Sequence, residues 1–482
     1  MQLRTVPAAA PIAPPDAIDA YEATLRGDLV RPSHPAYDEV RALYNAMIDK
    51  YPALIARCRD VADVMTTVNF ARDHSIPLAI RGGGHHGAGL SSVDDGLMLD
   101  LSLMKGIRVD PVARTARVEA GCTWLEVDHA THAFGLAVPS GTIASTGVAG
   151  LTLGGGIGHL SRRFGLTIDN LLAADVVLAN GKLVTASEGE HPDLFWALRG
   201  GGGNFGVVTS FLFRLHHVDT IVGGPTFWSL DQAPDVMRWY RDFIKTAPED
   251  LNGFFAFATI PPAPPFPEEL HGQKVCGIFW CYTGPQNQAD SVFAPVRTIM
   301  PPILDAVAPM PFPVLQSVLD VLVPPGLQWY WKADFVKELP DEAIEAHLEF
   351  ARTMPTQKST MHMYPINGAV HRVGRNDTAF SYRDVTWAMV IVGIDPDPAN
   401  AEAITTWARD YWEALHPYAA EGAYVNMFMD EGSERVRTAY RDNYDLLATV
   451  KARYDPTNLF RINQNIAPAR TPSASAWQAA GA

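Results

Sequence analysis

The sequence predicts an α+β protein of two domains, in which a glycine-rich first part is followed by an antiparallel sheet with helices on one face. The chain of 482 residues exceeds the usual size of a single core, and 47% of its residues are hydrophobic, enough for two large cores. Three glycine-rich segments fall between residues 81 and 211, and apolar strands alternate with helices from residue 221 onward. These observations place the expected domain boundary near residue 220.

The composition excludes several classes of partner and site. The net charge of −15 argues against nucleic acid or an anionic membrane surface, because both need clustered Lys and Arg. Backbone N–H groups still allow an acidic protein to bind phosphate. The cysteines show no C-x-x-C spacing, so neither a disulfide scaffold nor a metal site is expected. They are Cys58, Cys122, Cys276 and Cys281.

The chain shows no targeting or membrane segment. No uncharged apolar run is long enough to span a membrane. Prolines interrupt the N-terminal segment MQLRTVPAAAPIAPP, which is more typical of a flexible arm than of a signal peptide. We therefore expect a cytoplasmic protein whose partners are small molecules, and no feature specifies an oligomeric state.

The first glycine-rich segment, LAIRGGGHHGAGLSS (78–92), matches a dinucleotide-binding Rossmann loop at Gly82, Gly84 and Gly87. That fold usually needs a crossover helix after the turn. The following stretch AGLSSVDDG has no helical period and is rich in residues that break helices. The Rossmann interpretation therefore fails, and no role is expected for NAD(P).

Two further glycine-rich segments follow, GTIASTGVAGLTLGGGIG (141–158) and RGGGGNFGVVTSF (199–211). Tight turns explain any single segment of this kind. Three together indicate one extended ligand that the backbone contacts at several points. The other elements expected here are a helix over 61–71 capped by Asp60, strands over 77–80, 97–101, 107–109 and 116–118, a hairpin with a type I′ turn at Asn180-Gly181, and a helix over 192–198.

The second domain is predicted from its alternation of strands and helices. Its aromatic residues, Trp329 and Trp331 among them, are expected to fill the core for the most part, with a minority lining a pocket. The expected strands cover 227–230, 254–258, 275–282, 327–335, 361–364 and 387–392, and the expected helices cover 233–246, 341–353 and 398–415.

Several motifs occur in order: RGGGH (81–85), SGTIASTGVAGLTLGGGIG (140–158), FGLTIDNL (164–171), PDLFWALRGGGGNFGVVT (192–209), YVN (424–426) and YDPTNLFRINQNI (454–466). This set resembles the berberine-bridge-enzyme-like flavoproteins of the vanillyl-alcohol-oxidase, or PCMH-type, FAD-binding superfamily, and its bacterial members in particular. The resemblance implies an FAD-binding domain over 1–220 with a PCMH-type core over 50–218, an inserted substrate domain over 221–417, and a C-terminal segment, 418–482, that returns to the FAD domain.

By this resemblance the R-G-G-G-H turn holds the FAD pyrophosphate, and His85 bonds covalently to the 8α-methyl carbon of the flavin. Glycines let N–H groups reach phosphate oxygens, and a neutral imidazole nitrogen is a competent nucleophile. The alternative is a turn histidine that only forms hydrogen bonds. The resemblance also assigns to FAD the residues Arg81, Gly82, Gly83, Gly84, His86, Gly87, Thr142, Thr146, Gly147, Gly150, Gly154, Gly158, Val208, Asn426 and Asn463.

One position departs from many relatives, which carry a second, cysteinyl flavin link in a segment G-T-C-P-T. This chain has Ile143 where the thiol would lie, and Cys122 is expected to pack in the core. The FAD is therefore expected to be attached once, which lowers its expected potential and leaves a more open site.

The resemblance implies oxidation by hydride transfer to flavin N5, with a base that removes a proton and O2 that reoxidises the flavin to give hydrogen peroxide. Thr146 matches a position beside the isoalloxazine, where it either influences the approach of O2 or satisfies a backbone group. An oxygenase that acts through a flavin-oxygen adduct of the N5-oxide type, and a flavin-binding protein without turnover, are the alternatives. The substrate is expected to be an alcohol, phenol, sugar or polyketide-like compound that stacks on aromatic side chains.

The catalytic base is sought among tyrosines, because Met427 occupies the place where many relatives carry one. Tyr424 shares one side of an expected extended segment with Asn426, and Tyr382 lies on a strand expected to face the flavin. Lys332 is a further candidate. A tyrosine base needs its pKa of ~10 lowered by about 3 units, and plain packing is the alternative for each tyrosine.

Overall fold

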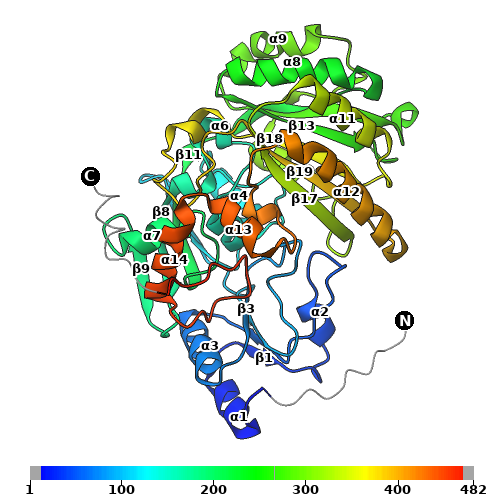
Figure 1. The fold of residues 1–482 in the computed structure, drawn as a ribbon. Helices are drawn as coiled ribbons and strands as arrows, with labels where there is room; N and C mark the ends of the chain where they lie inside the picture. Colours follow the sequence, from blue (N-terminus) through cyan, green and yellow to red (C-terminus); the bar gives the residue numbers. More distant parts are fainter. Residues whose placement is uncertain (1–11, 265, 471–482) are drawn as a thin grey trace.

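Residues 12–264 and 266–470 are described by the computed structural model (Figure 1). The expected N-terminal arm therefore lies mostly outside the described residues. A four-stranded and a five-stranded sheet form in the part before residue 215, and an eight-stranded sheet forms after it.

The first sheet has the strand order β1-β2-β4-β3, with β2 and β3 both parallel to β4. The side chain of Asp60 accepts a hydrogen bond from the backbone N–H of Asp63, which confirms the predicted helix cap. The elements are α1 (Pro15–Thr24), β1 (Asp28–Val30), α2 (Tyr37–Arg41), β2 (Leu54–Arg57), α3 (Val61–Asp73), β3 (Leu78–Arg81) and β4 (Leu97–Asp100).

The glycine turn connects two parallel strands, β3 and β4, and this corrects the sequence argument against a crossover. Residues 82–96 contain no helix, as predicted. They still carry the chain to a parallel neighbour, because a crossover needs about a dozen residues and only usually a helix. The turn is thus part of a long loop and is free to line a cavity.

The second sheet is antiparallel, in the order β5-β6-β10-β8-β9. The predicted hairpin is confirmed, but its type I′ turn is wrong. Gly181 has a φ of 78° and its N–H donates to Leu178 O, whereas Asn180 has no positive φ, which is typical of a three-residue loop. The elements are β5 (Ile107–Asp110), β6 (Thr115–Glu119), α4 (Trp124–His132), β7 (Leu136–Ala137), α5 (Val148–Gly154), α6 (Ser161–Phe164), β8 (Leu171–Val177), β9 (Leu183–Ser187), α7 (Pro192–Leu198), β10 (Val207–Arg214) and β11 (His216–His217).

The large sheet is also antiparallel, in the order β15-β12-β14-β13-β18-β19-β17, with β16 beside β12. Its six long strands and three of its helices confirm the predicted elements. They are β12 (Thr220–Ser229), α8 (Ala233–Thr246), β13 (Leu251–Thr259), β14 (Lys274–Tyr282), α9 (Ala289–Thr298), β15 (Leu304–Asp305), β16 (Ala308–Pro311), α10 (Phe312–Ser317), β17 (Gln328–Val336), α11 (Asp341–Arg352), β18 (Thr360–Pro365), β19 (Trp387–Asp395) and α12 (Ala401–Leu415).

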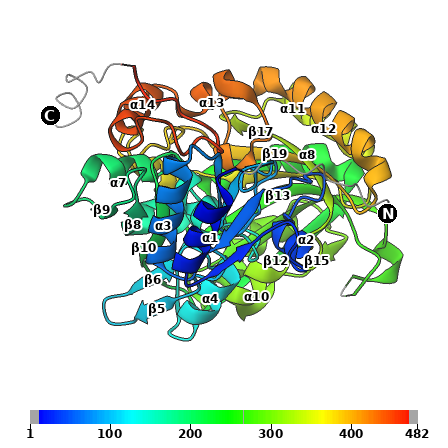
Figure 2. The ribbon, with the colours of Figure 1, turned by 90° about the horizontal axis from the view of Figure 1, so that it is seen from below.

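The two faces of the large sheet have different partners. Helices α8, α11 and α12 pack on one face, where Met361, Met363 and Ile391 contribute to their core (Figure 1). On the other face, Tyr364 and Val390 belong to the same apolar cluster as side chains of β3 and β4. Figure 2 shows α1, α3 and the first sheet in front of this inner face. The large sheet therefore lies between its own helices and the glycine-rich part.

The C-terminal helices α13 (Gly432–Tyr440) and α14 (Asn443–Tyr454) return to the glycine-rich part, where α14 packs against α7 (Figure 1). The ammonium group of Lys451, fully buried, donates to the carboxylate of Asp455 (2.6 Å) and to the carbonyls of Asn204 (2.6 Å) and Phe460 (2.9 Å). A buried ion pair needs such additional hydrogen bonds to offset its desolvation. This cluster fixes the C-terminal segment to the third glycine-rich loop.

Replacing Lys451 by Met should lower the free energy of unfolding by about 3–5 kcal/mol, because Asp455 would stay buried without its counter-charge. Lys105→Met is the control, since the Lys105–Glu126 pair is 40% exposed on each side and contributes at most about 1 kcal/mol. Denaturant unfolding of both variants measures the difference. Equal losses would contradict the argument from the buried pair.

Candidate active site

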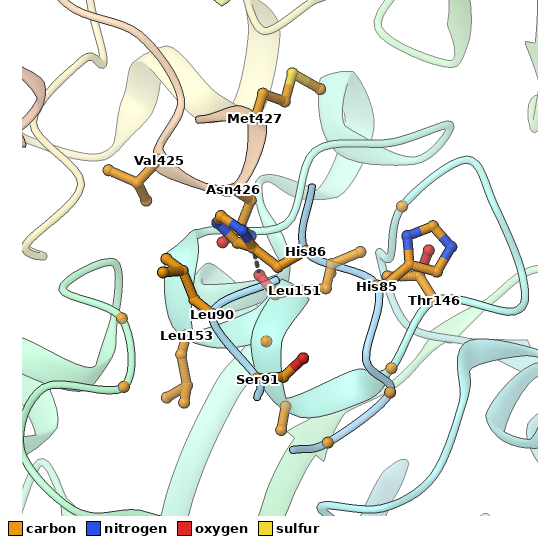
Figure 3. A pocket seen from close by; sticks show the side chains of 18 of the residues that line it. His85, His86, Leu90, Ser91, Thr146, Leu151, Leu153, Val425, Asn426 and Met427 are labelled. Carbon is orange, nitrogen blue, oxygen red and sulfur yellow. Dashed lines mark hydrogen bonds between the residues drawn. The ribbon is translucent and has the colours of Figure 1, made fainter. Parts of the chain in front are cut away.

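A cavity of about 360 Å³ lies between the glycine-rich segments and the inner face of the large sheet. Its wall comes from the turn after β3, from α5 and the loop before it, from β17, β18 and β19, and from C-terminal residues 424–427, 460 and 462–464. Figure 3 shows part of this wall. Segments more than 300 positions apart in the sequence therefore meet at one site.

Most of the residues that the sequence assigns to cofactor binding line this cavity. They are Gly82, Gly83, Gly84, His85, His86, Thr142, Thr146, Gly147, Gly150, Val208, Asn426 and Asn463. Of the candidate bases, Tyr424 lines it as well.

Four assigned residues lie behind the wall and have packing roles instead: Arg81, Gly87, Gly154 and Gly158. An N–H of the Arg81 guanidinium donates to the carbonyl of Val40. A Cβ on Gly87 would lie 2.3 Å from the Trp331 ring, and a Cβ on Gly158 would lie 2.1 Å from the carbonyl oxygen of Ser140. These glycines are needed for the close approach of neighbouring residues.

The first two glycine-rich segments touch through their backbones. A Cβ on Gly83 would lie 2.6 Å from both N and Cα of Gly147, and a Cβ on Gly147 would lie 2.4 Å from N of Gly83. No side chain larger than hydrogen fits at either position. The contact brings His85 and Thr146 to the same part of the wall.

His85 presents an unpaired nitrogen in the wall. Its imidazole stacks on the ring of Tyr44, with 3.7 Å between the ring centroids and 22° between the planes, and its Nε2 has no hydrogen-bond partner among the described residues. Burial lowers the pKa of His85 to about 4, so the ring is neutral at pH 7. A neutral imidazole with a free nitrogen is competent as a nucleophile.

His86 points away from His85, toward Asn426 (Figure 3). Its Nδ1 accepts a hydrogen bond from the N–H of Ala88 (3.2 Å), and its Nε2 has no partner among the described residues. Burial lowers the pKa of His86 to about 4 as well. The two histidines thus present neutral nitrogens on opposite sides of one turn.

The C-terminal segment docks on α5 through Tyr424 and Asn426. The Tyr424 hydroxyl accepts hydrogen bonds from the N–H of Gly156 (2.7 Å) and from Nδ2 of Asn426 (2.8 Å). Nδ2 of Asn426 also donates to Leu151 O (3.1 Å; Figure 3), and Gly154 leaves room, because a Cβ there would lie 2.2 Å from Oδ1 of Asn426. Both side chains thus hold the segment in place.

This docking does not favour Tyr424 as a base. Residues Val425–Met427 form a 3₁₀ turn, so the extended segment expected from the sequence is wrong. Burial raises the pKa of Tyr424 to about 12, whereas a tyrosine base at neutral pH needs a lowered pKa.

Tyr382 lies outside the cavity, which corrects its assignment as a base. It belongs to an irregular segment and not to a strand of the sheet. Its hydroxyl donates to Thr438 O (2.9 Å), and its ring stacks on Phe335 (4.4 Å) beneath the guanidinium of Arg441 (3.6 Å). Burial raises the pKa of Tyr382. Lys332 is also outside the cavity wall, where it forms an ion pair of 2.6 Å with a glutamate.

Ile143, which the resemblance aligns with the second, cysteinyl flavin link, lines the cavity. The four cysteines, all buried and free, are absent from the wall. The hydroxyl of Thr146 forms no hydrogen bond with other described residues, which argues against the alternative that it satisfies a backbone group. No protein thiol among the described residues therefore reaches a ligand in this cavity.

Sequence reasoning missed His362 and Tyr364, which occupy alternate positions of β18 and so face the same side. The Tyr364 hydroxyl lies 2.7 Å from Nδ1 of His362 and 3.4 Å from Oγ1 of Thr142. Burial lowers the pKa of His362 to about 4 and raises that of Tyr364 to about 12. The signal was the pattern Met-His-Met-Tyr, which puts both polar residues on one face.

The cavity wall carries no charged side chain. Among the described residues that line it, none is Asp, Glu, Lys or Arg. The sheet contributes Val390, Val392 and Ile394 together with Trp329 and Trp331, whose indole N–H groups have no protein partner in the described chain. This inner-face part of the wall suits an apolar body, since burying an unpaired charge against it is costly.

Comparison with known proteins was made for both sequence and structure. Residues 52–187 match the family model of the FAD binding domain, and residues 423–467 match the model described as berberine and berberine like. An FAD-linked oxidoreductase of Dictyostelium discoideum is 31% identical over 94% of this chain and 97% of its own length. The chain belongs to the berberine-bridge-enzyme-like FAD-linked oxidoreductases.

Two further relatives and one crystal structure support this family assignment. An FAD-linked oxidoreductase of Bacillus subtilis is 32% identical over 92% of this chain and 98% of its own, and (R)-6-hydroxynicotine oxidase of Paenarthrobacter nicotinovorans is 27% identical over 92% and 97%. The crystal structure of 6-hydroxy-D-nicotine oxidase from Arthrobacter nicotinovorans superposes with a TM-score of 0.83 at 25% identity, covering 96% of this chain and all of that one. The predicted family, fold class and oxidoreductase assignment are confirmed.

The wall fits the FAD of this family. The unpaired Nε2 atoms of His85 and His86 and the unpaired Oδ1 of Asn463 need partners, which a polar ligand supplies. Backbone at Gly150 and Gly203 is open, because no atom lies within 4 Å of a Cβ added there. Within the described part of the chain, no cluster of His, Cys, Asp or Glu is arranged to hold a metal ion, and no helix is long and apolar enough to cross a membrane.

Gly147→Ala should lower the free energy of unfolding by about 1–3 kcal/mol, because its methyl group would overlap the backbone of Gly83. The same variant should be purified with less FAD, since the two turns can no longer touch. Gly189→Ala is the control, as no atom lies within 4 Å of its added Cβ. Thermal unfolding and the ratio of flavin to protein absorbance measure both effects. A Gly147→Ala protein with wild-type stability and flavin content would contradict the backbone contact between the two turns.

Proposed function

We propose that this FAD-linked oxidoreductase is an oxidase, flavinylated through His85 alone, that oxidises a small uncharged hydroxyl compound. The observation that carries the proposal is the neutral, unpaired imidazole of His85 in a glycine-built wall that no thiol reaches. The FAD supplies the acceptance of hydride and the subsequent reduction of O2 to hydrogen peroxide. The chain's own residues bind and orient the substrate and exclude water from the site.

His85 is the better of the two histidines for the covalent link. Its ring is held by the stacking of Tyr44, whose hydroxyl donates to Val323 O, and its Nε2 has no hydrogen-bond partner among the described residues. One nitrogen of His86 already accepts the N–H of Ala88. A rigid, neutral imidazole reacts without first losing a proton or a hydrogen bond.

Gly83, Gly147 and Gly150 support the rest of the cofactor site. The backbones of Gly83 and Gly147 touch each other, and the open backbone at Gly150 lets a ligand approach main-chain N–H groups. Asn426 and Tyr424 hold α5 against the C-terminal segment and so keep this backbone in position. Thr146, with its free hydroxyl in the wall, is our candidate for a group that meets O2.

The charge-free wall narrows the class of substrate. Val390, Val392 and Ile394 offer no hydrogen bonds to the many hydroxyls of a sugar, and unpaired buried polar groups are disfavoured. Trp329 and Trp331 suit a flat or apolar body. An uncharged aromatic or aliphatic alcohol or phenol therefore fits these surfaces.

The covalent link predicts that acid-precipitated protein stays yellow and that the flavin-bearing proteolytic peptide contains residues 81–90. His85→Ala should still bind FAD without a covalent bond, because the glycine backbone is intact. His86→Ala is the matched control and should remain covalently flavinylated. Flavin that washes out of the wild type on denaturation, or a flavin peptide from another segment, would overturn the proposal.

The charge-free wall predicts that benzyl alcohol reduces the flavin anaerobically at least ~100-fold faster than para-carboxybenzyl alcohol at equal concentration, because a buried unpaired carboxylate is disfavoured by several kcal/mol. Stopped-flow bleaching of the flavin measures the rates. With air admitted, peroxide should form in the same amount as aldehyde. Equal rates for the two alcohols would refute the substrate class, and oxygen from labelled O2 in the product would favour an oxygenase.

A further inference from the structure

We propose that Tyr364 and His362 form the proton-accepting pair of the cavity: Tyr364 binds the substrate hydroxyl, and His362 takes up the proton. The inference rests on the proposed oxidation of a hydroxyl compound and names the residues that handle its proton. Neither residue belongs to the glycine-rich segments or to the C-terminal motif.

The register of the sheet fixes where this pair points. His362 lies opposite Val390 on β19 and opposite Ala256 on β13, and Tyr364 lies opposite Ala388. The intervening Met363 packs under the helices on the other face. Both polar side chains therefore face the cavity, and His362 is half-buried in its wall.

The pair lies beside an aromatic ring and the hydroxyl of Thr142. The ring of Phe254 lies 5.2 Å from the His362 ring and 5.0 Å from the Tyr364 ring, measured between centroids. Oγ1 of Thr142 lies 3.4 Å from the Tyr364 hydroxyl. In such surroundings the imidazole stays neutral and the phenol stays protonated, so the phenol donates its hydrogen to Nδ1.

The proton step balances as follows. The substrate O–H bond breaks and its proton bonds to the oxygen of Tyr364, while the former phenol proton moves to Nδ1 of His362. Tyr364 ends unchanged and His362 ends as an imidazolium. The carbon-bound hydrogen and its electron pair are accepted by the flavin of the proposed reaction, so the alcohol becomes a carbonyl compound.

The chain contains a matched pair outside the cavity. Nδ1 of His347 on α11 lies 2.7 Å from the hydroxyl of Tyr411 on α12, the same distance as in the cavity pair. His347 and Tyr411 are buried under the other face of the sheet and are absent from the cavity wall. Tyr411→Phe removes the same kind of hydrogen bond without touching a ligand.

The first test is binding of phenol to the FAD-loaded protein by isothermal titration calorimetry, which needs no turnover. Tyr364→Phe should weaken binding about three- to tenfold, the loss of one hydrogen bond, whereas Tyr411→Phe should bind as the wild type does. Wild-type protein that does not bind phenol, or equal weakening in both variants, would overturn the proposal.

The second test separates binding from proton transfer, with benzyl alcohol as the reductant. Tyr364→Phe should slow anaerobic flavin reduction at least ~100-fold, as expected for a positioned base. His362→Gln keeps an acceptor for the Tyr364 hydroxyl but cannot take up its proton, so it should lower kcat by at least ~10-fold and leave phenol affinity and KM within about threefold. Unchanged rates in both variants would overturn the proton role. Failure of benzyl alcohol and other uncharged alcohols to bleach the wild type would instead overturn the oxidation itself, and with it the proton role.

Discussion

The backbone contact between Gly83 and Gly147 determines the arrangement of the cofactor wall. It joins two segments that are more than sixty residues apart, at a separation that no side chain tolerates. Asp320 adds a second restraint, because its carboxylate accepts hydrogen bonds of 2.8 Å from the N–H groups of both Ala144 and Ser145. His85 and Thr146 therefore meet in the wall as a consequence of backbone packing. Function at this site rests on glycines that themselves carry no chemistry.

The large sheet supplies the opposite wall by the same kind of simple geometry. Successive residues of a strand point to opposite faces, so β18 gives Met361 and Met363 to the helices and His362 and Tyr364 to the cavity. A shift of one residue in register would exchange the two sets. Pairing of β18 with both β13 and β19 prevents that shift, so the position of the polar pair is fixed by main-chain hydrogen bonds on both sides.

Sequence reasoning succeeded where the signal is local and failed where it depends on distant contacts. The cap at Asp60, the helix Ala233–Thr246 and the strands of the large sheet follow from patterns within ten or fifteen residues. The parallel pairing of β3 with β4 does not follow from such a pattern. It depends on β2, a strand distant in the sequence, pairing with the other edge of β4.

The same dependence on distant contacts explains the outcome for the candidate bases Tyr382 and Tyr424. Tyr382 was placed on a strand by its neighbours in the sequence, but it lies beside α13, to which it donates a hydrogen bond. Tyr424 is in the wall, yet its hydroxyl accepts two hydrogen bonds that hold the chain together. His362 and Tyr364 become a pair only when the sheet brings them to the glycine-rich part, where Thr142 lies.

Burial gives the titratable groups of this cavity a common property, which links its three proposed roles. The same loss of solvent lowers the pKa of His85, His86 and His362 and raises that of Tyr364, so each group is uncharged at pH 7. Neutral His85 is nucleophilic, and neutral His362 has a lone pair to accept a proton. A wall without charges also disfavours a charged substrate. Flavin attachment, substrate choice and the neutral resting state of the proton acceptor therefore depend on one physical condition, the exclusion of water by the inner face of the sheet.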